Sequence, residues 1–125
     1  MQQKRYAEAE AELSRALQIN EASSAAHLFR GRALIELSRY AEAEKELLRA
    51  LALGGDDGAR MAHRYLGAIY IEQGETARAI ASLETYLRLD PKAGDTVQIQ
   101  GIIKQLRAQI TRPKKMIHPF TGYDQ

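Results

Sequence analysis

The feature that most constrains the fold is an internal repeat. The stretch RYAEAEKELLRALAL at 39–53 closely matches RYAEAEAELSRALQI at 5–19, and a looser copy, ETARAIASLETYLRL, follows at 75–89. Equivalent residues of the first two copies are 34 positions apart, and the next interval is 36. Self-similarity at this period predicts a solenoid, because each unit can bury its apolar face only by stacking on its neighbours.

The segments between these copies complete the repeat. They are AHLFRGRALIELSRY at 26–40 and AHRYLGAIYIEQGET at 62–76, and with the copies they resemble the tetratricopeptide repeat, a helix–turn–helix unit of 34 residues. The later unit has the family's signature residues at Leu66, Gly67, Tyr70, Gly74, Ala79, Leu83 and Pro91. The earlier one keeps Gly31, Tyr40, Ala43, Leu47 and Ala50, but has Arg30 and Ser38 where Leu and Gly are usual.

This resemblance covers residues 4–93 and implies an all-α fold, a right-handed superhelical solenoid of antiparallel helix pairs. We expect about two and a half repeats plus a C-terminal capping helix. The expected segments are the second helix of a truncated first repeat (1–22), a second repeat (23–57), a third repeat (58–93), a capping helix (94–111) and an extended tail (112–125). The chain would then be a piece of a longer array, with an uncovered apolar stripe on its first helix.

Individual residues predict where helices begin and approach one another. Ser23 or Ser24 is expected to cap the helix that follows, and Asp56 or Asp57 the helix after the GGDDG turn. Gly31 marks a close approach of two helices. Tyr86 replaces the alanines of the earlier copies, so wider or different packing is expected beyond it.

The last expected helix, 96–111, is the first helix of a fourth unit, since Gly101 lies 34 residues after Gly67. Its apolar positions are Val97, Ile99, Ile102, Ile103, Leu106 and Ile110, and its polar positions Gln98, Lys104, Gln105, Arg107 and Gln109 suit an outer face. The tail that follows contains Pro113 and Pro119, which exclude a continuous helix. It is either a disordered tail or a segment whose apolar residues dock in a groove of its own chain or of a neighbour.

Composition excludes several classes of function. The 125 residues carry a net charge of only +2, which argues against nucleic acid and anionic membranes as partners. There is no cysteine, no signal-like segment after Met1 and no apolar run long enough to span a membrane, so we expect a soluble protein of the cytoplasm or periplasm.

Catalytic and metal-binding constellations are not found in the sequence. The serines are scattered over repeat surfaces, and the glutamates of AEAEAE spread around their helix. His27 and His63 occupy equivalent positions of neighbouring repeats but lack a third and fourth metal ligand. We therefore expect no catalytic residues, no metal and no cofactor.

In the family, the first helices of successive repeats line a concave groove that receives a peptide or a helix. The resemblance places the corresponding residues at Leu28, Arg32, Ile35, Glu36, Met61, Arg64, Ala68, Ile71 and Glu72, continued by Gln98 and Ile102. The two arginines either bind an acidic group of a partner or pair with Glu36 and Glu72. The Lys, Asn and Arg clamp of chaperone-binding members is absent, since Met61 and Tyr65 occupy its later positions.

The sequence thus predicts a non-catalytic module that binds protein or peptide, part of a scaffold or adaptor in a bacterial-type assembly. Two alternatives remain open: a self-association module, a possible homodimer joined through the first helix or the tail, and an accessory domain of an enzyme whose catalytic part lies outside this chain. RNA binding would require basic residues on one face and a steep salt dependence.

Overall fold

The structure, a computed structural model, describes residues 2–111, except for the side chains of residues 56 and 57. The described residues form six helices: α1 Gln2–Ile19, α2 Ser24–Glu36, α3 Tyr40–Leu53, α4 Asp56–Glu72, α5 Thr76–Leu89 and α6 Thr96–Thr111. The predicted all-α repeat fold is confirmed. The tail at 112–125, and with it the expected docking of the tail, lies outside the described residues.

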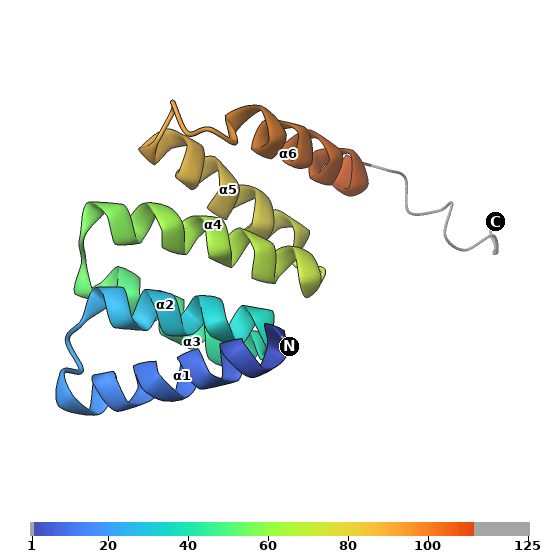
Figure 1. The fold of residues 1–125 in the computed structure, drawn as a ribbon. Coiled ribbons are helices and arrows are strands. Elements are labelled where there is room, and N and C mark those ends of the chain that lie inside the picture. Colours follow the sequence, from blue (N-terminus) through green and yellow to red (C-terminus); the bar gives the residue numbers. More distant parts are fainter. Residues whose placement is uncertain (1, 112–125) are drawn as a thin grey trace.

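The helices are stacked in chain order (Figure 1). Helices α2 and α3 form one packed pair and α4 and α5 the next, and α3 packs on α4 to join them. Helix α1 packs on α2, and α6 packs on α5. The first and last helices therefore lie at opposite ends of the stack (Figure 1).

Each helix pair closes at a glycine of its first helix. A Cβ atom on Gly31 would lie 2.8 Å from Leu47 Cδ2, and one on Gly67 would lie 2.6 Å from Leu83 Cδ2. Both distances are shorter than a carbon–carbon contact allows, so the close approach predicted at Gly31 is confirmed. The turns use left-handed backbone at equivalent positions, with φ 60° at Ser38 and 75° at Gly74.

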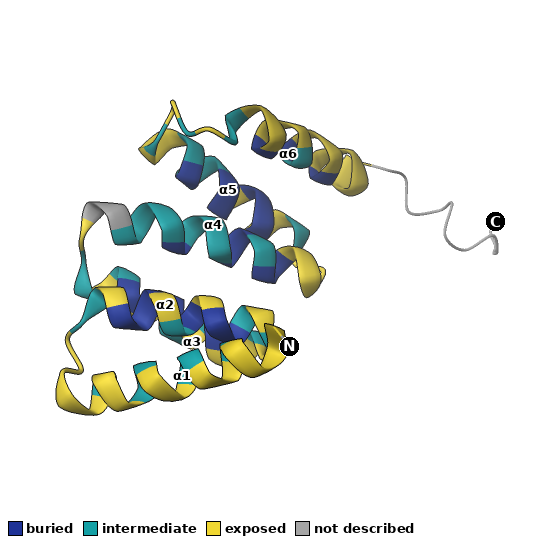
Figure 2. Ribbon diagram, in the orientation of Figure 1, coloured by how far each residue is buried: buried dark blue, intermediate teal, exposed yellow. Residues whose placement is uncertain are grey.

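The core follows the repeat. The equivalent positions Ala43, Leu47 and Ala50 of α3 are fully buried, and Ala79, Leu83 and Tyr86 of α5 are at most 3% exposed. The first helices of the pairs contribute Leu34, Leu66 and Ile69 to the same core. In α1 no residue is buried, so this helix is mostly exposed or half-buried (Figure 2).

The predicted helix starts are partly correct. Ser23 is the N-cap of α2, and its hydroxyl oxygen accepts a hydrogen bond from the Ala26 N–H at 3.1 Å. The prediction for α4 is wrong, because Gly55 is the N-cap and the helix begins at Asp56. Gly55 has a φ of 101° and Gly54 one of 92°, so the two glycines make the sharp turn and the helix starts directly after them.

The packing changes at the end of the stack, as expected from Tyr86. Helices α2 and α4 contact each other directly, whereas α4 and α6 do not, and the buried Tyr86 lies on α5 between them. Helix α6 buries Ile99, Ile103 and Leu106. Two of its apolar residues do not join the core, since Val97 is 80% and Ile110 50% exposed.

Within residues 2–111, every helix is too short or too polar to cross a membrane.

Candidate functional site

Two hollows lie along the surface shared by α2 and α4. The first, of about 500 Å³, lies at the beginning of both helices and is lined by Leu28, Phe29, Met61 and the glycines 54, 55 and 58, with Ser24 and Ala25. The second, of about 430 Å³, lies at their ends and is lined by Ile35, Glu36, Ser38, Tyr40, Ala68, Ile71 and Glu72. Residues 28 and 35, like 61 and 68, are seven apart and therefore share a helix face. The two hollows thus follow one side of the α2–α4 pair.

Most of the predicted groove residues line these hollows. Leu28 and Met61 lie in the first, and Ile35, Glu36, Ala68, Ile71 and Glu72 in the second. Arg32 is exposed on α2, one helical turn from Leu28 and from Glu36, and forms no ion pair among the described residues.

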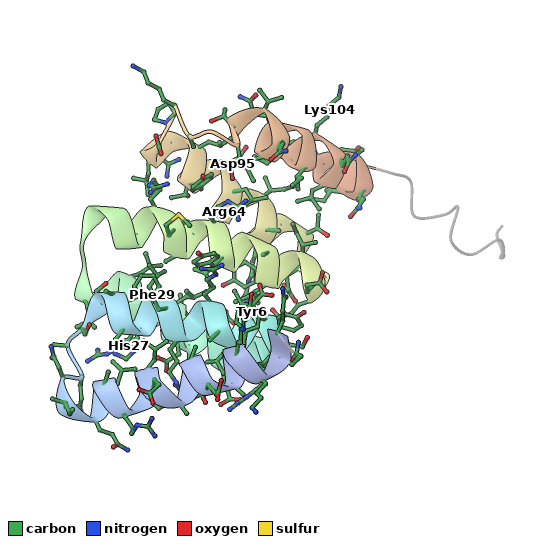
Figure 3. The ribbon with its side chains drawn as sticks, in the orientation of Figure 1. Tyr6, His27, Phe29, Arg64, Asp95 and Lys104 are labelled. Carbon is green, nitrogen blue, oxygen red and sulfur yellow. The ribbon has the colours of Figure 1, made fainter. Side chains whose placement is uncertain are left out.

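Arg64 is occupied within the chain. Its Nε donates to Asp95 Oδ2 at 2.7 Å, and its guanidinium lies over the Tyr86 ring at 5.9 Å from the centroid. The Tyr86 hydroxyl donates to Asp95 Oδ1 at 2.6 Å. Figure 3 shows Arg64 and Asp95 where α4 faces the start of α6. Hydrogen bonds from Tyr86 and Arg64 hold the pKa of Asp95 below its usual value despite partial burial, so this carboxylate is charged at neutral pH.

Neither alternative for the two arginines describes Arg64. Arg64 pairs with Asp95, which lies in the loop between α5 and α6, and not with a ligand or with Glu72. Of the two arginines expected to bind an acidic group of a partner, only Arg32 has no ion pair among the described residues. The Arg64 contact instead joins α4 to α6, which do not pack on each other directly.

A second charged cluster joins α1, α2 and α3. Arg30 binds Glu10 of α1 at 2.7 Å and Glu46 of α3 at 2.7 Å. His27 completes the cluster, with Nδ1 2.8 Å from Glu46 Oε1 and Nε2 2.9 Å from the Glu21 carbonyl oxygen. Burial opposes ionisation of Glu10, but hydrogen bonds from Arg30 and Ser14 bring its pKa below the usual value. The cluster contains two ion pairs, and both are formed by Arg30, a residue unusual at this position of the repeat.

The other sites considered from the sequence do not assemble in the described residues. Residues 2–111 contain no group of three or more His, Cys, Asp or Glu side chains able to hold a metal ion. His63 has a buried Nδ1 without a hydrogen-bond partner in this part of the chain, and burial followed by the nearby charge of Arg88 lowers its pKa. A neutral imidazole in a repeat junction is a packing residue.

Sequence reasoning missed two residues of this region. Phe29 is 52% exposed in the first hollow, and Figure 3 shows it between α2 and α4. Phe29 directly precedes Arg30 in the sequence. Because Arg30 lies between α1 and α3, a helical wheel places Phe29 on the side of α2 that faces the next repeat. Asp95 gave no comparable signal, because its contact with Arg64 depends on the path of the loop before α6.

The comparisons with known proteins agree with this architecture. The family model described as tetratricopeptide repeat matches residues 1–64, and a second model with the same description matches residues 61–93. Among solved structures, the TPR domain of OM64 from Arabidopsis is similar, with a TM-score of 0.75 and 19% identity over 82% of this chain and 83% of that chain. No curated protein matches the chain. At this identity the structural likeness concerns the fold, while the sequence models carry the assignment: the chain belongs to the tetratricopeptide repeat family.

Proposed function

We propose that this domain binds an extended peptide or a helix of another protein along the α2–α4 surface. Repeats of this family generally mediate protein–protein interaction. The observation that supports the proposal is the line of two hollows on one side of α2 and α4, with seven of the nine expected groove residues around them.

The chemistry of this surface favours a ligand with apolar side chains and an acidic group. Phe29 and Ile71 remain 52% and 37% exposed, so a ligand side chain in either hollow buries apolar area that is now in water. Arg32 lies between the hollows and is suited to a carboxylate, because a guanidinium binds carboxylate oxygens in pairs. Glu36 and Glu72 at the rim of the second hollow favour a basic residue of the ligand beyond that point.

The test starts from peptides selected on the full chain from a displayed random library. We expect the selected peptides to contain apolar residues and an acid, and to lose about tenfold or more in affinity when Phe29→Ala or Arg32→Ala is introduced. Leu48→Ala is the matched control, since Leu48 is an equally exposed apolar residue (47%) on α3. Peptides that bind all three variants equally, with their folding verified by circular dichroism, would place the binding surface elsewhere.

Self-association is the second candidate function, and a specific observation favours it. The apolar positions of α1 that correspond to the core positions of α3 and α5 are left half-buried or exposed. No residue contact within 2–111 specifically favours a role as accessory domain of an enzyme. We therefore compare only peptide binding and self-association.

A further inference from the structure

We propose that copies of this chain associate head to tail, with α1 of one copy packing on α6 of the next. In this arrangement α6 is the first helix and α1 the second helix of a repeat shared between two copies. The contact uses neither α2 nor α4, so it goes beyond peptide binding on the α2–α4 surface.

The donor face is the side of α1 that corresponds to the inner side of α3. Ala43, Leu47 and Ala50 of α3 are fully buried because they pack on α2 of the same pair. Their equivalents on α1 are Ala9 and Leu13, which are half-buried, and Ala16, which is exposed. Among the described helices α1 contacts only α2, through a different side that carries Glu10 and Ser14. The donor face, Ala9, Leu13 and Ala16 with Glu8 and Glu12, therefore lacks a partner helix in this part of the chain.

The acceptor face lies on α6 around Gly101. Gly31 and Gly67 receive a leucine of the second helix, with a Cβ position only 2.8 and 2.6 Å from that side chain. At Gly101, 34 residues after Gly67, a Cβ would meet no atom within 4 Å. One turn before it Val97 is 80% exposed, and Gln100 and Lys104 line an open hollow of about 480 Å³ between α5 and α6. The acceptor face, Val97, Gln100, Gly101 and Lys104, has the space for a leucine that no described residue fills.

Leu13 is the residue that fits this space. It is the equivalent of Leu47 and Leu83, the two leucines that lie against Gly31 and Gly67. Where α2 and α4 turn at Ser38 and Gly74, α6 has Ala108 and continues as helix to Thr111. A second copy supplies a helix of the required register through Leu13 of its α1.

Charges on the two faces are complementary. In the α4–α5 pair, Arg78 lies over the Tyr70 ring at 5.8 Å. The repeat places Glu8 of one copy at the position of Arg78 and Lys104 of the other at that of Tyr70, so these two residues meet across the contact. By the same register Glu12 reaches Gln100, as Glu46 reaches Arg30. Lys104 and Arg107 are the only charged residues of α6, and Lys104 points away from the stack (Figure 3).

The contact leads to an open chain of copies. Because α1 and α6 lie at opposite ends of one stack (Figure 1), each copy can donate at one end and accept at the other. A heterologous contact of this kind continues until the rotation closes a ring or the supply of copies ends. The expected signature is an average mass that rises with concentration beyond that of a dimer.

The first test is light scattering on the full chain across a concentration series, with Gly101→Leu as the blocking variant. In the isolated copy a Cβ atom at position 101 meets no described atom within 4 Å, and leucine favours a helix more than glycine does, so we expect the variant to fold. In the contact the new side chain occupies the place of Leu13, and overpacking of this size weakens association by about tenfold or more. A wild-type chain that stays monomeric to roughly millimolar concentration, or a variant that associates as well as wild type, would overturn the proposal.

The second test exchanges the charges. Lys104→Glu and Glu8→Lys each weaken association by roughly threefold at low salt, and the double variant recovers it. Lys45→Glu on α3 is the matched control, with the same change of net charge at an exposed lysine away from both faces. No recovery in the double variant would reject the proposed register. Phe29→Ala leaves association unchanged, so a failure of this proposal and a failure of peptide binding on the α2–α4 surface are separate results.

Discussion

At the scale of single residues, Gly31, Gly67 and Gly101 occupy equivalent positions of the repeat but have different surroundings. The first two glycines accept a leucine side chain at a distance where no Cβ fits, whereas a Cβ on the third would meet no atom of the described residues within 4 Å. Glycine at this repeat position thus allows close helix packing at residues 31 and 67, but not at residue 101 among the described residues. The sequence alone predicts the close approach at Gly31, but it does not tell that Gly101 is open, since this depends on which helices follow.

His63 provides a test at this scale. Burial, followed by the charge of Arg88, lowers its pKa, so the unfolded chain takes up this proton more readily than the folded one. Stability from the neutral ring is present above about pH 6.5, the unfolded value, and is lost as the pH falls through the folded pKa. Urea unfolding at pH 7.5 and 5.5 should show wild type losing more stability than His63→Leu.

The leucine variant also removes the buried Nδ1 that has no partner in residues 2–111. We therefore expect it to be no less stable than wild type at pH 7.5. His27→Gln is the control, because His27 has acceptors at both nitrogens and its loss should lower stability at both pH values. An equal loss of stability on acidification in wild type and His63→Leu would contradict the assignment.

At the scale of helices, the sequence predicted existence and order well because the apolar stripe recurs with the repeat. The starts of α2 and α5 follow from local signals such as Ser23 and the turn at Gly74. The start of α4 did not, since the two glycines before it take positive φ and leave no N-cap role for an aspartate. The exposure of Val97 was also missed, because the burial of a terminal helix face depends on a partner helix that the stripe itself cannot reveal.

Arg30 allows the attachment of α1 to be tested at this scale. The family usually has leucine at this position, yet Arg30→Leu removes the guanidinium that the half-buried carboxylates Glu10 and Glu46 share. We expect a loss of about 1–2 kcal/mol in the free energy of unfolding, below the cost of breaking a fully buried pair because these groups keep some contact with water. Urea denaturation at neutral pH measures this loss.

The matched control for Arg30→Leu is Arg15→Leu. Arg15 pairs with Glu12 on the same helix, but both side chains are at least 64% exposed, so its loss should stay within about 0.5 kcal/mol. If the two variants are equally stable, the Glu10–Arg30–Glu46 cluster contributes no more to stability than a surface ion pair.

At the scale of the whole molecule, the α2–α4 surface shows what a repeat register can and cannot predict. The register placed seven residues of the α2–α4 surface around the two hollows, because residues seven apart share a helix face. It misjudged Arg64, since the partner Asp95 comes from a loop whose path the register does not determine. Local periodicity therefore predicts which residues share one exposed helix face. Whether a charged side chain on that face already has an ion-pair partner can be seen only in the tertiary structure.

The stack also predicts how the molecule opens. Among the described helices, each repeat unit contacts only the adjacent units, so stability adds from one interface to the next and unfolding can begin at an end. Helix α1 has no buried residue and one neighbour, while α6 buries three residues and α3, α4 and α5 contain most of the core. Hydrogen exchange of the 125-residue chain in dilute solution should therefore show the fastest amide exchange in α1, slower exchange in α6 and the slowest in α3–α5. Raising the concentration should protect α1 and α6 together and leave α3 unchanged, because the proposed contact covers one face of each. Protection of α1 equal to that of α4 in dilute solution would mean that the end of the stack is more stable than its packing implies.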